Sequence, residues 1–266
     1  MDDAQFSQLL DYFSFSWAGY RKVRKGVKKR ITRHIQELEY RTIDDYIELL
    51  DNDRQLKSDC ERLLTVPISR FFRDRKLWET LPEKILPLFF DKESLNVWSA
   101  GCSGGEEVYS FKIAWKMITE KYHHLPLLNM TASDLNPENL DRAQKGVYQP
   151  SSLKEMDTAM GDRFFVKGPT RKSLAVKSYL KKGITWETFN LLYDQPPPKA
   201  YDIIFLRNNI LTYAAKDLRR AGFKNVVSAL ADPGILIIGV KERLPEGVTG
   251  FGSVELPYVF KKTSKK

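Results

Sequence analysis

The sequence has few of the residues that build metal centres or disulfide frameworks. Its 266 residues include only two cysteines, Cys60 and Cys102, and three histidines. The cysteines lie far apart and form no CxxC motif or Cys/His cluster. Neither a disulfide framework nor a zinc site is therefore indicated, and we predict no bound metal.

Long apolar runs are also missing. No run approaches the ~20 residues that a membrane-spanning helix needs. The first residues, MDDAQFSQLL, start acidic and lack the basic-then-apolar order of a secretory signal. We expect a cytoplasmic location, no membrane insertion and a monomer.

Acidic residues are outnumbered by basic ones. There are 34 Asp and Glu against 43 Lys and Arg, a formal net charge of +9. This excess favours an anionic partner, which by charge alone is a nucleic acid, an acidic protein surface or a membrane face.

Alternating strand patterns are absent from the first ninety residues. Apolar side chains recur there at three- and four-residue spacing, as in YRTIDDYIELLDND and LKSDCERLLTV. We predict a helical domain over residues 1–90.

A different pattern begins after the prolines of LPEKILPLFFDKESL. Four apolar runs, LNVWSAG, LNMTASDL, YDIIFLRNN and GILIIGVKE, are typical of buried parallel strands, with helical stretches at 106–121, 137–146 and 215–231. We predict a doubly wound α/β domain over residues 91–266. A basic, broken stretch between the second and third runs predicts a small antiparallel β insertion at about 163–186. The lysine-rich end, KKTSKK, is expected to be solvated.

The segment WSAGCSGGEE follows the first strand and carries the first sign of chemistry. Its glycines allow a ligand to approach the backbone, but the spacing is not GxGxxG. Glu106 and Glu107 then open the helix, where they would repel a pyrophosphate. A cationic ligand such as S-adenosylmethionine fits better, although favouring the helix start is an alternative role for both glutamates, more so for Glu106.

Asp134, in TASDLN, ends the second strand. It follows the glycine loop at roughly the distance expected of a carboxylate that binds ribose hydroxyls. The alternative is that it caps the next helix, with Pro137 in the first turn.

Several segments together resemble the CheR-type methyltransferases, which methylate chemoreceptor glutamates using S-adenosylmethionine. In order along the chain they are ISRFFRDRKLWETL, VWSAGCSGGEEVYS, ASDLNPENLDRAQKGVY, FNLLYD, YDIIFLRNN and GILIIGVKE. The resemblance implies a Rossmann-like methyltransferase domain behind a small helical domain. It also implies S-adenosyl-L-methionine as cofactor, S-adenosyl-L-homocysteine as product, and glutamyl methyl esters as the products on the protein substrate.

The resemblance also assigns roles to particular residues. Arg73 is the active-site arginine, and Gly101 lies against the cofactor. Glu107 holds the methionine ammonium, Asp134 the ribose, and Asn190 with Leu191 the adenine; Asn208 is the asparagine of the family's C-R-N strand and is also expected at the cofactor.

One segment departs from the family pattern, R-N-V-L-I-Y-F. Here RNNILTYA aligns Thr212 with the family's tyrosine and places Tyr213 one residue later. Either Tyr213 fills the catalytic position through a one-residue shift, or the aromatic wall is lost. In the second case the chain is a cofactor-binding regulatory module, or acts on another substrate.

The stretch YRKVRKGVKKRITRHIQELEY is strongly basic. Val23, Val27 and Ile31 recur at four-residue spacing and predict a helix with one buried face. The resemblance implies that its basic face docks an acidic helical region of a chemoreceptor, through residues that include Arg24, Lys28, Lys29 and Arg33. Nucleic acid is the rival partner, but we expect none, because the charged face lacks interleaved aromatics. The insertion either binds a receptor's tail peptide as an added strand or only covers the cofactor.

Overall fold

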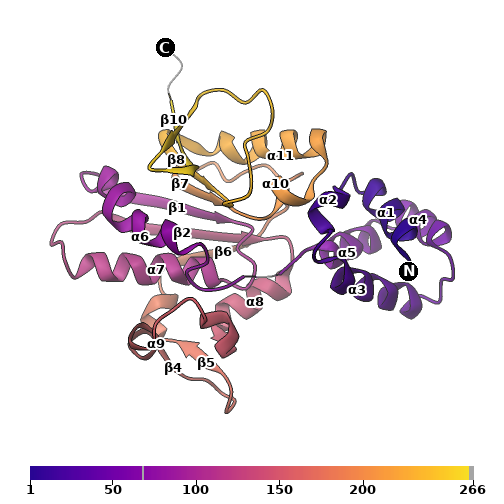
Figure 1. The fold of residues 1–266 in the computed structure, drawn as a ribbon, viewed down its shortest axis with the longest axis horizontal. Helices are drawn as coiled ribbons and strands as arrows, with labels where there is room; N and C mark the ends of the chain where they lie inside the picture. Colours follow the sequence, from indigo (N-terminus) through magenta and orange to yellow (C-terminus); the bar gives the residue numbers. More distant parts are fainter. Residues whose placement is uncertain (68, 264–266) are drawn as a thin grey trace.

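The computed structural model describes residues 1–67 and 69–263. The N-terminal part is helical, as predicted, and Figure 1 shows it set at one end of the molecule. Its helices are α1 (Asp3–Tyr12), α2 (Trp17–Tyr20), α3 (Arg24–Glu37), α4 (Ile43–Asn52) and α5 (Arg54–Leu64). Their apolar faces meet in one core around Phe6, Tyr46 and Leu64, which are fully buried. This core provides most of the stability of such short helices.

A seven-stranded sheet, in the order β6-β2-β1-β7-β8-β10-β9, organises the rest of the described chain. The strands are β1 (Ser94–Ala100), β2 (Leu127–Asp134), β6 (Ile184–Thr188), β7 (Tyr201–Leu206), β8 (Leu230–Ile238), β9 (Phe251–Val254) and β10 (Leu256–Lys262). Strands β6, β2, β1, β7 and β8 are parallel, whereas β10 runs antiparallel to both β8 and β9.

Helices cover both faces of this sheet. The chain moves from β1 through β2 to β6 in one direction, and from β7 to β8 in the other. Right-handed crossovers in opposite directions place their helices on opposite faces. Thus α7 (Glu106–Thr119) and α8 (Pro137–Lys145) lie on one face, and α11 (Lys216–Ser228) on the other (Figure 1). The order reverses between β1 and β7, where open sheets of this kind bind ligands.

The predicted α/β architecture is therefore confirmed, including the four apolar strands and the three helices between them. Sequence analysis did not predict β6, β9 or β10. Strand β6 is an edge strand with partly exposed side chains, so its polar sequence does not prevent it from pairing with β2. Lys261 and Lys262 of the basic end belong to β10, and residues 264–266 lie outside the described part.

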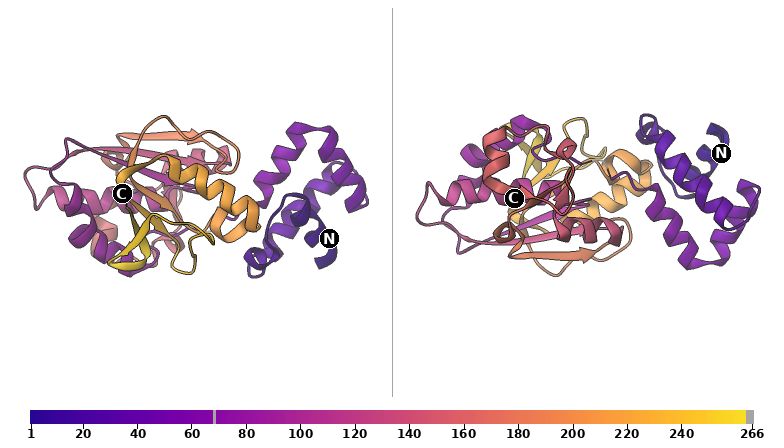
Figure 2. Two further views of the ribbon diagram at one scale, coloured as in Figure 1. Left: turned by 90° about the horizontal axis from the view of Figure 1, so that it is seen from above. Right: turned by 90° about the horizontal axis from the view of Figure 1, so that it is seen from below.

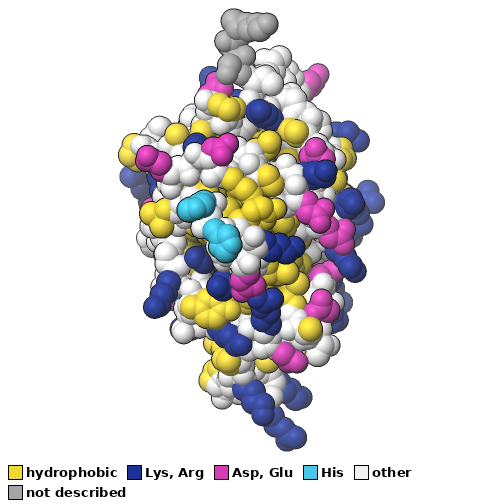
Figure 3. All heavy atoms as spheres, turned by 90° about the vertical axis from the view of Figure 1, so that its left-hand side faces the viewer, with side chains coloured by type: hydrophobic (Ala, Val, Ile, Leu, Met, Phe, Trp, Pro, Cys, Tyr) yellow, Lys and Arg dark blue, Asp and Glu magenta, His cyan; other side chains and the backbone are white. Residues whose placement is uncertain are grey.

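A second, three-stranded antiparallel sheet projects below α8 in Figure 1. It consists of β3 (Val147–Tyr148), β4 (Phe165–Lys167) and β5 (Leu174–Val176), with α9 (Thr158–Phe164) and the short 3-10 helices η3 (Pro150–Leu153) and η4 (Ser178–Lys181) beside it. Figure 3 shows basic side chains gathered at this lower end of the molecule, while charges of both signs mix over the end opposite the N-terminal helices. Strand β4 is three residues long and forms an edge of this small sheet.

The two hydrophobic cores divide the chain earlier than residue 90. The N-terminal core extends to Leu64, and the core around the sheet begins at Phe71. Helix α6 (Arg75–Thr80), the π-helix η1 (Leu81–Ile85) and the 3-10 helix η2 (Leu86–Phe89) pack with the sheet. The domain boundary at residue 90 remains a prediction, whereas Leu64 packs in the N-terminal core and Phe71 already packs in the core around the sheet.

Main-chain contacts join the N-terminal part to α10 (Ile210–Tyr213), the short helix after β7 (Figure 2). The Ser16 amide donates to the Tyr213 carbonyl at 2.7 Å, and the Ala215 amide donates to the Ser14 carbonyl at 2.8 Å. Gly19 in α2 lies so near that an added Cβ would stand 2.3 Å from the Thr212 carbonyl oxygen. The N-terminal helices are therefore fixed against the wall of the sheet domain.

Replacing Gly19 by alanine should loosen this junction. The Cβ would meet backbone, which cannot move aside as a side chain can, and we expect a loss of about 1–3 kcal/mol in the free energy of unfolding, measured with urea. Gly26→Ala is the matched control, because nothing lies within 4 Å of an added Cβ in that exposed helical position. Equal stability of the two variants would contradict the proposed close contact.

Candidate active site

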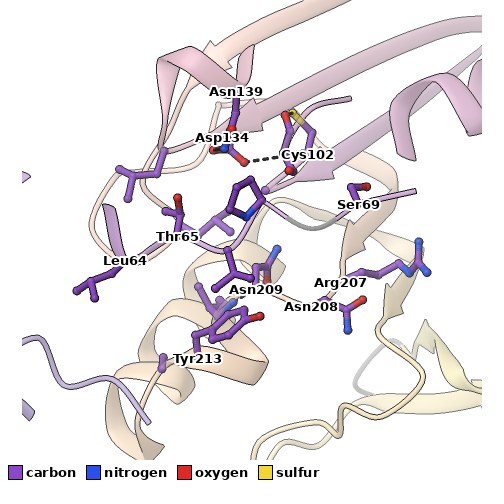
Figure 4. A pocket seen from close by; sticks show the side chains of 18 of the residues that line it. Leu64, Thr65, Ser69, Cys102, Asp134, Asn139, Arg207, Asn208, Asn209 and Tyr213 are labelled. Atoms are coloured by element: carbon purple, nitrogen blue, oxygen red, sulfur yellow. Dashed lines mark hydrogen bonds between the residues drawn. The ribbon is translucent and has the colours of Figure 1, made fainter. Parts of the chain in front are cut away.

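A cleft opens at the carboxyl ends of β1, β2 and β7, where the strand order reverses, and the N-terminal helices close its other side. Figure 4 shows its side chains converging from these separate segments. The cleft is lined by every residue that the sequence assigned to cofactor or chemistry: Arg73, Gly101, Glu107, Asp134, Asn190, Leu191, Asn208 and Tyr213.

The glycine loop after β1 is shaped by contacts within the protein. Gly101 has φ +81°, and a Cβ there would stand 2.6 Å from the Asn209 amide nitrogen. The amides of Gly101 and Cys102 both donate to the Ser133 carbonyl, at 2.8 and 2.7 Å. Glycine thus lets β1 turn sharply beside β2 and lets Asn209 approach the loop.

The two glutamates that follow the loop have different surroundings. Glu106 is fully buried, and its Oε1 pairs with Arg142 at 2.5 Å, away from the cleft. Glu107 lines the cleft; its Oε1 accepts from the Ser99 hydroxyl at 2.6 Å and its Oε2 from Arg207 at 2.7 Å. Only the second glutamate is placed to meet a ligand.

Arg207 was not predicted from the sequence, although it immediately follows β7. Its side chain is buried and donates to Glu107, to Asp74 Oδ2 at 2.6 Å and to the Arg73 carbonyl at 3.1 Å. Burial alone would lower the pKa of Arg207, but the two carboxylates outweigh it and the pKa lies above its ordinary value. The guanidinium is therefore a fixed charge that joins the turn after Arg73 to Glu107.

Asp134 ends β2 and points into the cleft (Figure 4). Its Oδ2 accepts from the Ser103 amide at 2.8 Å, and its Oδ1 from the Asn136 amide and the Asn139 side chain at 2.9 and 3.0 Å. The N-cap of α8 is Asn136, so the alternative capping role for Asp134 does not apply. Burial raises the pKa of Asp134, although these hydrogen bonds favour its ionised form.

Asn190 and Leu191 lie in the loop after β6. The Asn190 side-chain oxygen accepts from the Leu192 amide at 3.0 Å, and its nitrogen donates to both oxygens of Glu61 at 3.3 and 3.1 Å. Glu61 belongs to α5 and is 9% exposed. This second residue missed by sequence analysis is separated from Asn190 by more than a hundred positions, and no local motif marks it.

The turn after β7 is held by Glu242. One carboxylate oxygen accepts from the amides of Asn208 and Gly239, at 2.9 and 2.7 Å, and the other from the Thr212 hydroxyl at 2.5 Å. Asn209 binds the Ala100 carbonyl at 2.6 Å and caps α10. Asn208 lines the cleft with φ +57°.

Thr212 and Tyr213 therefore have distinct places. Thr212 faces Glu242, whereas Tyr213 lines the cleft and packs against Tyr20 with ring centroids 4.9 Å apart (Figure 4). Burial raises the pKa of Tyr213, and the charge of Arg73 acts in the opposite sense. Of the two residues, only Tyr213 therefore lines the cleft.

Backbone strain is concentrated around the cleft. Seven residues other than glycine have positive φ in the described part of the chain, and Phe72, Asp74, Ser103 and Asn208 are four of them. Such conformations cost on the order of 1–3 kcal/mol each and tend to occur at functional sites. The cleft is also where the buried Ser103 hydroxyl has no hydrogen-bond partner within the described residues.

These surroundings fit a ligand that combines positive charge with hydroxyl groups and an apolar ring. Glu107 and Asp134 supply acceptors, the unpartnered Ser103 hydroxyl supplies a further polar group, and Phe189 and Leu191 supply apolar surface. S-adenosylmethionine has these features: a sulfonium, an ammonium, a ribose and an adenine.

The predicted partner-binding residues lie elsewhere, on α3. Arg24 and Lys28 are partly buried and both pair with Asp3, at 3.3 and 2.8 Å. Lys29 and Arg33 are exposed. The basic face of α3 is thus divided between residues that hold the helix to α1 and residues directed to solvent.

Comparison with known proteins adds independent findings. A family model described as "CheR methyltransferase, SAM binding domain" matches residues 68–260. Chemotaxis protein methyltransferases of Listeria innocua and Listeria monocytogenes are 30% and 31% identical over 221 residues, which cover 82% of this chain and 81% of each relative. Chemotaxis protein methyltransferase 1 of Vibrio cholerae is 25% identical over 222 residues, covering 82% of this chain and 80% of its own. Across residues 1–67 and 69–263, no helix is both long and apolar enough to cross a membrane.

Removal of the Arg207 charge should destabilise the protein strongly. Arg207→Met leaves two partly buried carboxylates without their cation, and we expect a loss of about 3–5 kcal/mol in the free energy of unfolding, measured with urea. Arg75→Met is the control, since it breaks only an exposed pair with Glu79 and should change stability little. Similar losses in the two variants would refute the importance of the buried network.

Proposed function

The chain belongs to the CheR methyltransferase family, and from this premise we propose that its S-adenosylmethionine-dependent methyl transfer is directed to glutamate side chains of a chemoreceptor-like protein in chemotaxis. The single observation that carries the proposal is the meeting of Arg73, Glu107, Asp134, Asn190 and Tyr213 in one cleft. They come from separate segments, so their convergence is not a consequence of sequence proximity.

The charges along the cleft support an assignment of the cofactor's parts. Glu107, held by Ser99 and Arg207, would bind the methionine ammonium. Asp134 would accept hydrogen bonds from the ribose hydroxyls, and Asn190 and Leu191 would lie beside the adenine. Gly101 and Asn208 would line the middle of the cofactor.

The reaction needs little from the protein beyond position. When bound, S-adenosylmethionine supplies an electrophilic methyl group on a cationic sulfur. A glutamate side chain, with an ordinary pKa of about 4.3, is ionised at neutral pH and needs no general base. Arg73 would orient that carboxylate with its planar guanidinium, and Tyr213 would form the aromatic wall beside it.

The direct test is incubation with methyl-labelled S-adenosylmethionine and a receptor cytoplasmic fragment. We expect label that is released by base, as a methyl ester is. Cofactor binding without any labelled protein would instead support the regulatory alternative, and label that resists base would indicate another acceptor.

Arg73→Lys tests the orienting role. A lysine keeps the charge but loses the two-point grip, so we expect methyl transfer to slow by about a hundredfold while the cofactor Kd changes less than about threefold. Arg75→Lys makes the same change at an exposed neighbouring arginine and should leave the rate unaltered. An unchanged rate in Arg73→Lys would remove this residue from the proposed chemistry.

We propose that the exposed cations of α3 dock the acidic helical region of the substrate. Lys25, Lys29 and Arg33 are exposed, whereas Arg24 and Lys28 are partly engaged by Asp3. Arg30 donates to the carbonyls of Leu63 and Thr65 and so holds the end of α5 instead of facing a partner.

Reversal of the three exposed charges, as Lys25→Glu, Lys29→Glu and Arg33→Glu together, should raise the KM for the receptor fragment about tenfold. The effect should shrink as salt increases, since exposed charges are screened. The cofactor Kd should not change. A control variant reverses three exposed lysines on other surfaces, Lys121, Lys154 and Lys224. Equal effects in the two triple variants would show a response to net charge instead of a docking face.

A further inference from the structure

Glu61 is a carboxylate of the N-terminal helices that reaches the cleft of the sheet domain. It lies one turn before the end of α5, lines the cleft and is 9% exposed. No ion pair involving Glu61 occurs among the described residues, although most buried carboxylates in proteins are paired with a cation. A buried acceptor of this kind needs hydrogen-bond donors.

The protein supplies fewer hydrogen-bond donors than the Glu61 carboxylate can accept. Both oxygens share one donor, the Asn190 side-chain nitrogen, at 3.3 and 3.1 Å. A carboxylate has about four acceptor sites, so capacity remains on the side that faces the cleft. Burial raises the pKa of Glu61, an effect that the Asn190 donor only partly offsets.

The position of Glu61 along the cleft indicates which part of the cofactor it meets. Figure 4 places Leu64, the next turn of α5, on the opposite side of the cleft from Arg207. Arg207 marks the end where Glu107 lies, and Glu61 contacts Asn190 at the other end. Under the proposed function, on which this step rests, that other end holds the adenine.

We infer that Glu61 is a specificity-determining residue that accepts a hydrogen bond from the exocyclic amino group of the cofactor's adenine. In a purine with a carbonyl oxygen in place of this amino group, that oxygen would face the Glu61 carboxylate. Both groups accept hydrogen bonds, so the carboxylate would be left without a donor. The N-terminal helices would then select the cofactor's base as well as dock the substrate.

The test compares binding of S-adenosylhomocysteine and S-inosylhomocysteine, which differ in this amino group, to the full chain by calorimetry. The wild type should prefer the amino form by at least about tenfold, the effect expected when a buried polar group loses its partner. Glu61→Gln keeps the shape but offers either a donor or an acceptor, so the preference should fall to within about threefold. Glu48→Gln, on α4 outside the cleft, is the control and should keep the wild-type preference.

Two outcomes would overturn the inference: a wild type that binds both ligands equally well, or a Glu61→Gln variant that keeps the full preference. If Glu61→Gln does not fold, Glu61→Asp decides the matter, because a shorter carboxylate should weaken S-adenosylhomocysteine binding more than S-inosylhomocysteine binding, and equal weakening would contradict the inference. Failure of the wild type to bind S-adenosylhomocysteine would count against the proposed cofactor site itself. This outcome differs from a failure of the Glu61 inference, in which S-adenosylhomocysteine still binds but is not preferred.

Discussion

The buried charge of Arg207 is the constraint around which the cleft is arranged. It neutralises Glu107 on one side and Asp74 on the other, and binds the Arg73 carbonyl between them. A guanidinium can make these contacts at once because its donors lie in a fixed plane. The segment that carries Arg73 is thereby tied to the helix that carries Glu107. Loss of this cation would leave both partly buried carboxylates without their ion-pair partner, which is strongly destabilising.

Much of the fold was predictable from the sequence because buried parallel strands have a strong local pattern. LNVWSAG and YDIIFLRNN each contain a mostly apolar run, since strands β1 and β7 are largely buried and covered on both faces. Strand β6 lacks that pattern because it lies at the edge, where Thr185 and Glu187 can point outward without cost. The boundary between the cores was harder to place, because α6 is helical in sequence yet packs with the sheet.

Site residues could be predicted where the local sequence indicates them. Residues whose place in the site depends on distant partners in the tertiary structure were missed. Asp134 ends a strand and follows a glycine loop, so its position could be inferred from the order of elements. Glu61 and Arg207 depend on partners a hundred or more residues away, and nothing near them in the sequence identifies those partners. Glu242 could not be predicted for the same reason, since it follows β8 but holds the turn after β7.

The short helix α10 also bears on how this chain is compared with its relatives. Consecutive residues of a helix point about 100° apart, so Thr212 and Tyr213 cannot exchange places without moving the backbone. Thr212 is fixed on Glu242, and Tyr213 faces the cleft. The tyrosine at the cleft thus comes one residue later than the tyrosine of the family pattern R-N-V-L-I-Y-F. Residue-by-residue pairing with that pattern places Thr212 opposite the family's tyrosine, although in this chain Thr212 contacts Glu242 and Tyr213 lines the cleft. An exchange of the side chain at position 212 alone would therefore alter the contact with Glu242 and leave the aromatic side chain at the cleft in place.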